Sequence, residues 1–286
     1  MKKNHFWRNF FLCNLCIGSL IALNAWFFLA NFGWIYYKYI IFRDLEFYVY
    51  NFVLLLCLAL ARKLELRFAE LNEILQYKTE SFLKSNAARR RNIQLTEQEN
   101  LAFIMSSEHF YSVRTFRIMH YDLCNLVKTY NDMFGRIILS SVVFNIANLL
   151  AKVTFVIDYC ININSVEQRR LWGYFLGIIG FWIFANVGQT FLFSFYGDQL
   201  QKEGEKTTRI CFYLLNRVSI TPCNDDEKLV QDELKLMAYQ SYTRIPALSA
   251  GGFFDINFRV LGLMISSITS YLMVIIQFLL RPNNSS

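Results

Sequence analysis

One stretch of the sequence carries polar side chains at a spacing suited to binding a small molecule. Between Arg136 and Asp158 the chain is mostly apolar, and the exceptions include a row at 4-3-4 spacing: Ser141, Asn145, Asn148 and Lys152. That spacing puts the row on one face of a helix. Amides and an ammonium group hydrogen-bond polar ligands, whereas exposing them to lipid is costly. We therefore expect the last three residues of the row to line a ligand pocket, unless the row only hydrogen-bonds a neighbouring helix.

Aromatic residues flank this row and would complete such a pocket. Tyr159 follows the row directly, and Trp172 and Trp182 lie in the next apolar stretch of the chain. We expect these three side chains to form the pocket walls. Asn186 and Gln189, farther along the same stretch, allow the same two interpretations as the polar row.

A second row of interest lies in the last apolar stretch, between Arg259 and Arg281. Its members again recur at 4-3-4 spacing and share one helix face: Ser270, Val274, Gln277 and Arg281. An amide such as Gln277 inside an apolar helix either bonds a neighbouring helix or faces a water-filled path. The residues alone leave both interpretations open.

Enzymatic chemistry finds no support in the sequence. It contains no His, Cys and Asp cluster at metal-ligand spacing, no glycine-rich phosphate loop and no nucleophile elbow. Cys13 and Cys16 form a CxxC, but it lies in an apolar stretch without a second pair. We expect no catalytic residues, no metal and no cofactor.

The composition excludes an ordinary soluble domain. Hydrophobic residues make up 55% of 286, aromatic residues 17%, and there are only three prolines. The 29 Lys and Arg residues cluster between long apolar runs, which is typical of membrane spans alternating with polar loops. The net charge of +7 therefore reflects membrane topology, and we expect a lipid bilayer rather than a nucleic acid as partner.

A span needs about 20 apolar residues to cross the hydrocarbon core. The sequence supplies five such stretches, at about 10–36, 40–61, 137–157, 171–196 and 260–280. The N-terminus and alternate loops carry 23 Lys and Arg against five in the other loops. The positive-inside rule then predicts a cytoplasmic N-terminus and an extracellular C-terminus.

The cytoplasmic segments are also predicted to be helical, at about 62–80, 96–136, 197–216 and 228–258. Apolar residues recur at helical spacing from Leu64 to Leu75, and a longer seam runs from Val113 through His120 to Phe134. Thr96 and Glu99 match a capping box, and the basic stretch 81–94 is interpreted as a flexible linker. The predicted fold is an all-α membrane protein, a single domain over 1–286, with five transmembrane helices whose inner ends extend into a cytoplasmic helical bundle.

The last fifty residues resemble the insect gustatory receptor family. The segment SAGGFFDIN, at 249–257, leads into the last span, which contains Ser270-Tyr271, five hydrophobic residues and Gln277-Phe278. The family signature is Thr-Tyr, five hydrophobic residues and Gln-Phe, so only the threonine differs. Residues 67–72, 120–134 and Cys211 resemble the inner ends of the family's fourth, fifth and sixth helices, and the resemblance covers most of the chain.

The resemblance implies a seven-helix ligand-gated cation channel, related to insect odorant receptors, in which four subunits surround a central pore. The five spans correspond to the family's third to seventh helices. The first two are missing, so we expect a naturally short member or an incomplete sequence. The pore would be lined by Ser270, Val274 and Gln277, with Phe278 as an apolar gate and Tyr271 as a signature residue.

These observations favour a taste receptor subunit in the plasma membrane, a tastant-gated non-selective cation channel. Its expected partners are a small-molecule tastant and other gustatory receptor subunits in a homo- or hetero-tetramer. One alternative is a non-conducting fragment or modulatory subunit. Another is a small membrane transporter, for which inverted repeats and broken helices would be expected. The number and orientation of the spans disfavour a G-protein-coupled receptor.

Overall fold

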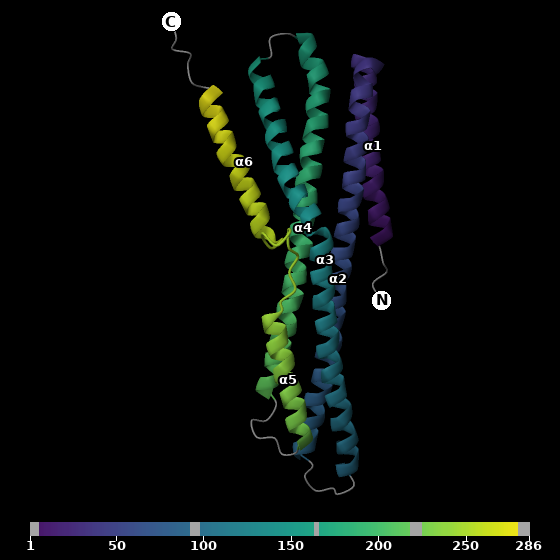
Figure 1. The fold of residues 1–286 in the computed structure, drawn as a ribbon, viewed down its shortest axis with the longest axis vertical. Coiled ribbons are helices and arrows are strands. Elements are labelled where there is room, and N and C mark those ends of the chain that lie inside the picture. Colours follow the sequence, from purple (N-terminus) through teal and green to yellow (C-terminus); the bar gives the residue numbers. More distant parts are fainter. Residues whose placement is uncertain (1–5, 92–97, 163–165, 218–224, 280–286) are drawn as a thin grey trace. The chain divides into compact units, whose positions relative to one another are not determined.

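The fold is known from a computed structural model that describes residues 6–91, 98–162, 166–217 and 225–279 (Figure 1). This part of the chain is helical and contains no β-strand, only an isolated bridge between Ser249 and Asp255. The helices are α1 (Phe6–Phe32), α2 (Trp34–Arg91), α3 (Gln98–Asn162), α4 (Val166–Arg217), α5 (Asp225–Thr243) and α6 (Phe258–Leu279). The predicted all-α fold is confirmed.

The described residues form two compact units, where the sequence suggested a single domain. We call residues 1–60, 136–195 and 257–286 the span unit, and residues 61–135 and 196–256 the bundle unit. Helices α2, α3 and α4 contribute residues to both units, whereas α1 and α6 belong to the span unit and α5 to the bundle unit.

Five of the described helices are long and apolar enough to cross a membrane, as predicted. The qualifying segments are Asn14–Asn31 in α1, Asp44–Lys78 in α2, Val113–Ile157 in α3, Leu176–Asn216 in α4 and Phe258–Gln277 in α6. The first span ends earlier than expected, because α1 stops at Phe32 and α2 begins at Trp34. Gly33 separates them with φ at 76°, a left-handed conformation that glycine adopts without steric cost.

The bundle unit is held together by an apolar core drawn from four helices. Its buried residues come from α2, α3, α4 and α5, and they are Leu71, Leu75, Phe116, Cys211, Met237 and Ala238. The predicted seam on α3 is confirmed, since Phe116, His120, Val127 and Tyr130 are all buried. The His120 ring packs edge to face against Phe68, and its side chain is fully buried. It is therefore a packed residue of the seam.

Two predicted boundaries in the bundle unit are wrong. Helix α2 continues to Arg91, where a flexible linker over 81–94 was expected; residues 81–91 contain neither Pro nor Gly, so nothing stops the helix. Helix α5 ends at Thr243 instead of running on to residue 258. Pro246 disfavours helix at the preceding residue, and Gly251 and Gly252 have positive φ. Thr96 lies outside the described residues.

We call residues 244–256, which follow α5, the connector. Asn131 of α3 makes two hydrogen bonds to the connector. Its side-chain amide donates to the Ala247 carbonyl and accepts from the Ser249 amide, each at 2.9 Å. The Ile256 amide donates to the Leu248 carbonyl at 2.7 Å and closes the connector on itself. The connector is thus a fixed part of the bundle unit, although it has no regular secondary structure.

Candidate functional site

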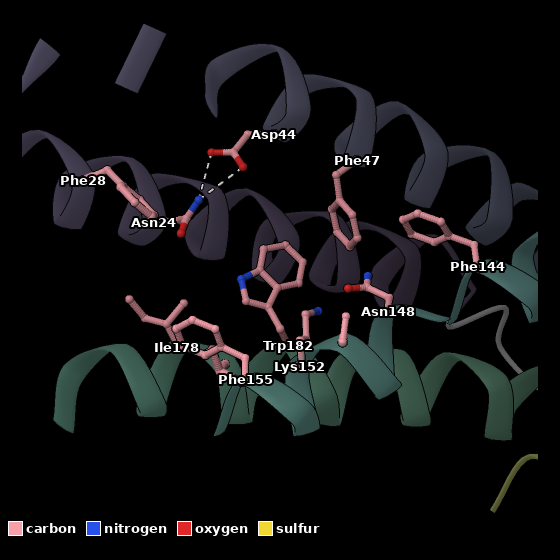
Figure 2. Close-up of a pocket in the computed structure, with 12 residues that line it drawn as sticks. Asn24, Phe28, Asp44, Phe47, Phe144, Asn148, Lys152, Phe155, Ile178 and Trp182 are labelled. Atoms are coloured by element: carbon pink, nitrogen blue, oxygen red, sulfur yellow. Dashed lines mark hydrogen bonds between the residues drawn. The ribbon is translucent and has the colours of Figure 1, made fainter. Parts of the chain in front are cut away.

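The span unit contains a cavity of about 370 Å³, surrounded by residues of α1, α2, α3 and α4 (Figure 2). Its lining residues are Asn24, Phe28, Asp44, Phe47, Phe144, Asn148, Ala151, Lys152, Phe155, Ile178, Ile179 and Trp182. Cavities that hold small molecules begin at about 300 Å³ and combine apolar walls with a few polar groups. This cavity has that composition, with room for a small ligand.

A carboxylate and an amide form one polar end of the cavity. Asn24 of α1 donates from Nδ2 to both carboxylate oxygens of Asp44 of α2, at 3.2 and 3.0 Å (Figure 2). Both residues are only 4% exposed. A buried carboxylate is costly unless hydrogen bonds stabilise it, so the Asn24 amide holds Asp44 in a defined position at the cavity wall.

A lysine and a tryptophan form the opposite wall. The Lys152 ammonium lies 5.4 Å from the centre of the Trp182 ring, within the range of a cation–π interaction. Trp182 in turn packs edge to face against Phe47, with ring centres 4.4 Å apart. These contacts connect α3, α4 and α2 and give the ammonium group a fixed aromatic support.

Helix α6 makes its contacts through one apolar face near its start. Val260 and Met264 are buried, and the Phe258 ring lies 5.9 Å from that of Phe191 on α4. Farther along, the side chains of Ser270, Tyr271, Val274 and Gln277 are all exposed. Phe278 belongs to α6, but its side chain lies outside the described residues. Helix α6 (yellow in Figure 1) therefore exposes these four side chains in the described part of the chain.

Comparison with known proteins identifies the family. A sequence model of the family described as 7tm Chemosensory receptor matches residues 1–280. This chain belongs to that family. Membership confirms the predicted resemblance and a multi-pass membrane protein, and the family is one of receptors rather than enzymes.

One curated protein is similar to part of this chain, and one solved structure shares its fold. The Caenorhabditis elegans protein named Gustatory receptor family protein 3 is 24% identical over 100 residues, which cover 35% of this chain and 22% of the relative. Among solved structures, the insect olfactory receptor OR5 from Machilis hrabei, solved in complex with eugenol, matches with a TM-score of 0.63. That match covers 96% of this chain and 68% of OR5 at 10% identity, so it shows the fold.

The structure brings together some of the residues expected at a pocket and separates others. Asn148, Lys152 and Trp182 all line the cavity. Asn145 does not; it is buried and donates to the Thr190 hydroxyl of α4 at 3.4 Å, which is the helix-to-helix bond given above as the alternative. Tyr159 and Trp172 lie in α3 and α4, with side chains outside the described residues.

Sequence reasoning missed the side of the cavity formed by α1 and α2. Asn24, Phe28, Asp44 and Phe47 were not predicted there, yet all line the cavity. For Asp44 a signal existed, because an ionisable residue inside a membrane span is by default a candidate for a functional site. The aromatic residues gave no signal, since phenylalanines occur throughout this chain.

Proposed function

We propose that this chain is a subunit of a ligand-gated cation channel that detects small molecules, with the ligand in the cavity and the pore along α6. The observation that carries the proposal is the exposure of Ser270 and Gln277 on a helix able to span the membrane. Polar side chains in a span need protein or water around them. Four copies of α6 around one axis would supply both, with Gln277 amides hydrating a passing cation.

The proposed gating route follows α4 from the cavity to α6. Trp182 lines the cavity, and Phe191 lies nine residues farther along the same helix, against Phe258 at the start of α6. A ligand opens the pore only to the extent that it binds the open state more tightly than the closed state. We infer that ligand contacts on Trp182 shift α4 and reach α6 through the Phe191–Phe258 contact.

We further propose a taste or related chemosensory role at the plasma membrane, with a small-molecule tastant as agonist and a homo- or hetero-tetramer as the conducting form. The charge distribution supports a cytoplasmic N-terminus and an extracellular C-terminus. A tag inserted at 89–91 should be labelled only in permeabilised cells. Labelling of intact cells would overturn this orientation.

The pore assignment is tested by ion selectivity. Because the chain covers 68% of OR5, we would express it as a chimera in which two helices of a functional relative precede it. Gln277→Glu adds a carboxylate to each subunit of the ring and should raise the permeability of divalent relative to monovalent cations, read as a shift in reversal potential. Gln76→Glu adds the same charge on an exposed face of the bundle unit and should leave the reversal potential unchanged. The same reversal potential in both variants would contradict the assignment of α6 to the pore.

A further inference from the structure

A second pocket, of about 450 Å³, lies in the bundle unit between α3 and α5, and we call it the basic pocket. Arg117 and Tyr121 line it from α3, Tyr239 and Gln240 from α5, and Arg244 from the connector directly after α5. Its volume falls in the range of pockets that hold small organic molecules. Because all of these residues belong to the bundle unit, the basic pocket is a different site from the cavity of the span unit.

Arg244 is held at the basic pocket by contacts with α3 and α5. Its guanidinium carbon lies 4.8 Å from the centre of the Tyr121 ring, within the range of a cation–π interaction. The Cys124 thiol donates to the Arg244 carbonyl at 3.4 Å, and the Arg244 amide donates to the Gln240 carbonyl at 3.0 Å. Arg244 forms no ion pair with a carboxylate of the described residues. Its exposed side chain therefore offers a positive charge and N–H donors in a defined position.

Arg117 brings a second guanidinium group to the same pocket. Its Nε donates to the Glu233 carboxylate at 2.8 Å, an ion pair that orients the side chain and uses one of the five N–H donors of the guanidinium. Gln240 donates to the Arg117 carbonyl at 3.0 Å. Tyr121 lies one helical turn from Arg117 on the same face of α3, and Arg244 contacts its ring. The two guanidinium groups therefore occupy neighbouring positions, and with Glu233 included they carry one excess positive charge.

We propose that the basic pocket binds a small organic phosphate, with its phosphate group at Arg117 and Arg244 and its body against the tyrosine rings. A phosphate monoester presents three terminal oxygens and a charge of about −1.5 to −2 at neutral pH, so it can accept hydrogen bonds from two guanidinium groups at once. A carboxylate offers only two oxygens and one charge. The Tyr121 and Tyr239 side chains are 41% and 69% exposed, so both rings are accessible to a flat ligand body.

Three compounds test the proposal by direct binding. Phenyl phosphate carries both the phosphate and a ring, inorganic phosphate lacks the ring, and benzoate replaces the phosphate with a carboxylate. Binding to the full chain in phosphatidylcholine nanodiscs would be measured by calorimetry. Phenyl phosphate should bind about tenfold more tightly than either of the other two, because each lacks one of the two contacts. Equal affinities for phenyl phosphate and benzoate, or no binding of phenyl phosphate, would overturn the phosphate site. Equal affinities for phenyl phosphate and inorganic phosphate would overturn the organic ligand.

Phosphate groups of this kind occur both on free organic molecules and on phosphoinositide headgroups. The same titration in nanodiscs that also contain phosphatidylinositol 4-phosphate distinguishes the two sources. Loss of phenyl phosphate binding there would identify the lipid headgroup as the occupant. Unchanged binding would identify a free organic phosphate.

Variants assign the phosphate to the two arginines. Arg244→Gln should weaken phenyl phosphate binding about tenfold. Glu233→Gln keeps a polar partner for Arg117 but removes the opposing negative charge, so it should tighten binding about threefold; a weaker affinity would show that the ion pair only maintains the structure. Arg209→Gln is the control, because this exposed arginine lies on α4, away from the pocket lining, and its affinity should equal that of the unmodified chain. Equal losses in Arg244→Gln and Arg209→Gln would contradict the site, and the ranking of the three compounds decides the proposal if a variant does not fold.

Discussion

The bundle unit and the span unit differ most clearly in the surroundings of their glycines. In the bundle unit, a Cβ on Gly135 would lie 2.8 Å from the Gly251 amide nitrogen, and one on Gly197 would collide with the Ile256 carbonyl oxygen. A Cβ on Gly204 would collide with the Pro246 ring. In the span unit, the glycines at 18, 33, 173, 177, 180, 188 and 262 have nothing within 4 Å of that position.

Buried polar groups show the same contrast. In the bundle unit, Asn72 donates to the Glu203 carbonyl and carboxylate and accepts from Thr207, with distances of 2.7 to 2.8 Å. Among the described residues of the span unit, Asn145 Oδ1, Asn186 Nδ2 and Ser194 Oγ are buried without a hydrogen-bond partner. In the bundle unit Asp198 Oδ2 also has no hydrogen bond assigned, but it lies 2.7 Å from the Lys202 ammonium.

The comparison teaches that the two units are specified by different interactions. The bundle unit is determined by its own backbone contacts and polar bonds, which leave no space for a side chain at Gly135, Gly197 or Gly204. The span unit keeps space around its glycines and has buried polar atoms without a hydrogen bond, which suits the proposed binding of a ligand and of neighbouring subunits. Changes in the bundle unit should therefore affect folding, and changes in the span unit should affect response.

The largest effect is expected at Gly197. Gly197→Ala forces a Cβ against the Ile256 backbone and should cost about 3 kcal/mol, the upper end of overpacking penalties. Gly188→Ala on the same helix has open space and should be neutral or stabilising by about 0.5–1 kcal/mol. Thermal unfolding midpoints in detergent check both. Similar decreases in the unfolding midpoint for the two variants would contradict the difference in packing between the units.

Buried asparagines give the next largest difference. Asn72→Ala removes three hydrogen bonds from a fully buried residue and should cost about 2–3 kcal/mol. Asn145→Ala removes one long bond of 3.4 Å and should cost less than about 1 kcal/mol. Unfolding midpoints again provide the measurement, and a larger loss for Asn145→Ala would reverse our account of the two units.

The smallest effect concerns coupling within the span unit. Phe191→Ala removes the ring contact with Phe258, a contribution of about 0.5–1.5 kcal/mol. It should shift the agonist concentration for half-maximal current by about three- to tenfold, with ligand binding in nanodiscs unchanged. Phe184→Ala, on an exposed part of the same helix, is the matched control. An unshifted response in Phe191→Ala would exclude this route.

The parts of the fold that depend on local pattern could be predicted from the sequence. The five spans follow from the length of the apolar stretches. The seam from Phe116 to Tyr130 follows from helical spacing, because the position of a residue along a helix determines the face on which it lies. Even the missed end of α5 had a local signal in Pro246 and the two glycines. The sequence-based prediction gave the apolar helical spacing more weight than these breakers.

Only the part of the cavity lining that comes from α3 could be predicted from residue spacing, for a physical reason. Asn148 and Lys152 share a helix face, so their spacing placed them together. Their partners on α1 and α2 are positioned by helix packing, which no spacing within one segment encodes. Asn145 shows the converse: it shares the face of Asn148, yet packing directs it to Thr190 and away from the cavity lining.

The central claim is that two different parts of the span unit carry the two roles. The cavity recognises the ligand, and α6 conducts. The most direct measurement of this claim is whole-cell current in the chimera, recorded with and without agonist for Lys152→Met and Phe278→Ala. Phe278→Ala should raise the basal leak by removing an apolar constriction, with the agonist dependence retained. Lys152→Met should weaken the agonist response and leave leak and reversal potential unchanged. If Phe278→Ala left the leak unaltered, or if Lys152→Met changed ion selectivity, this division of roles would be contradicted.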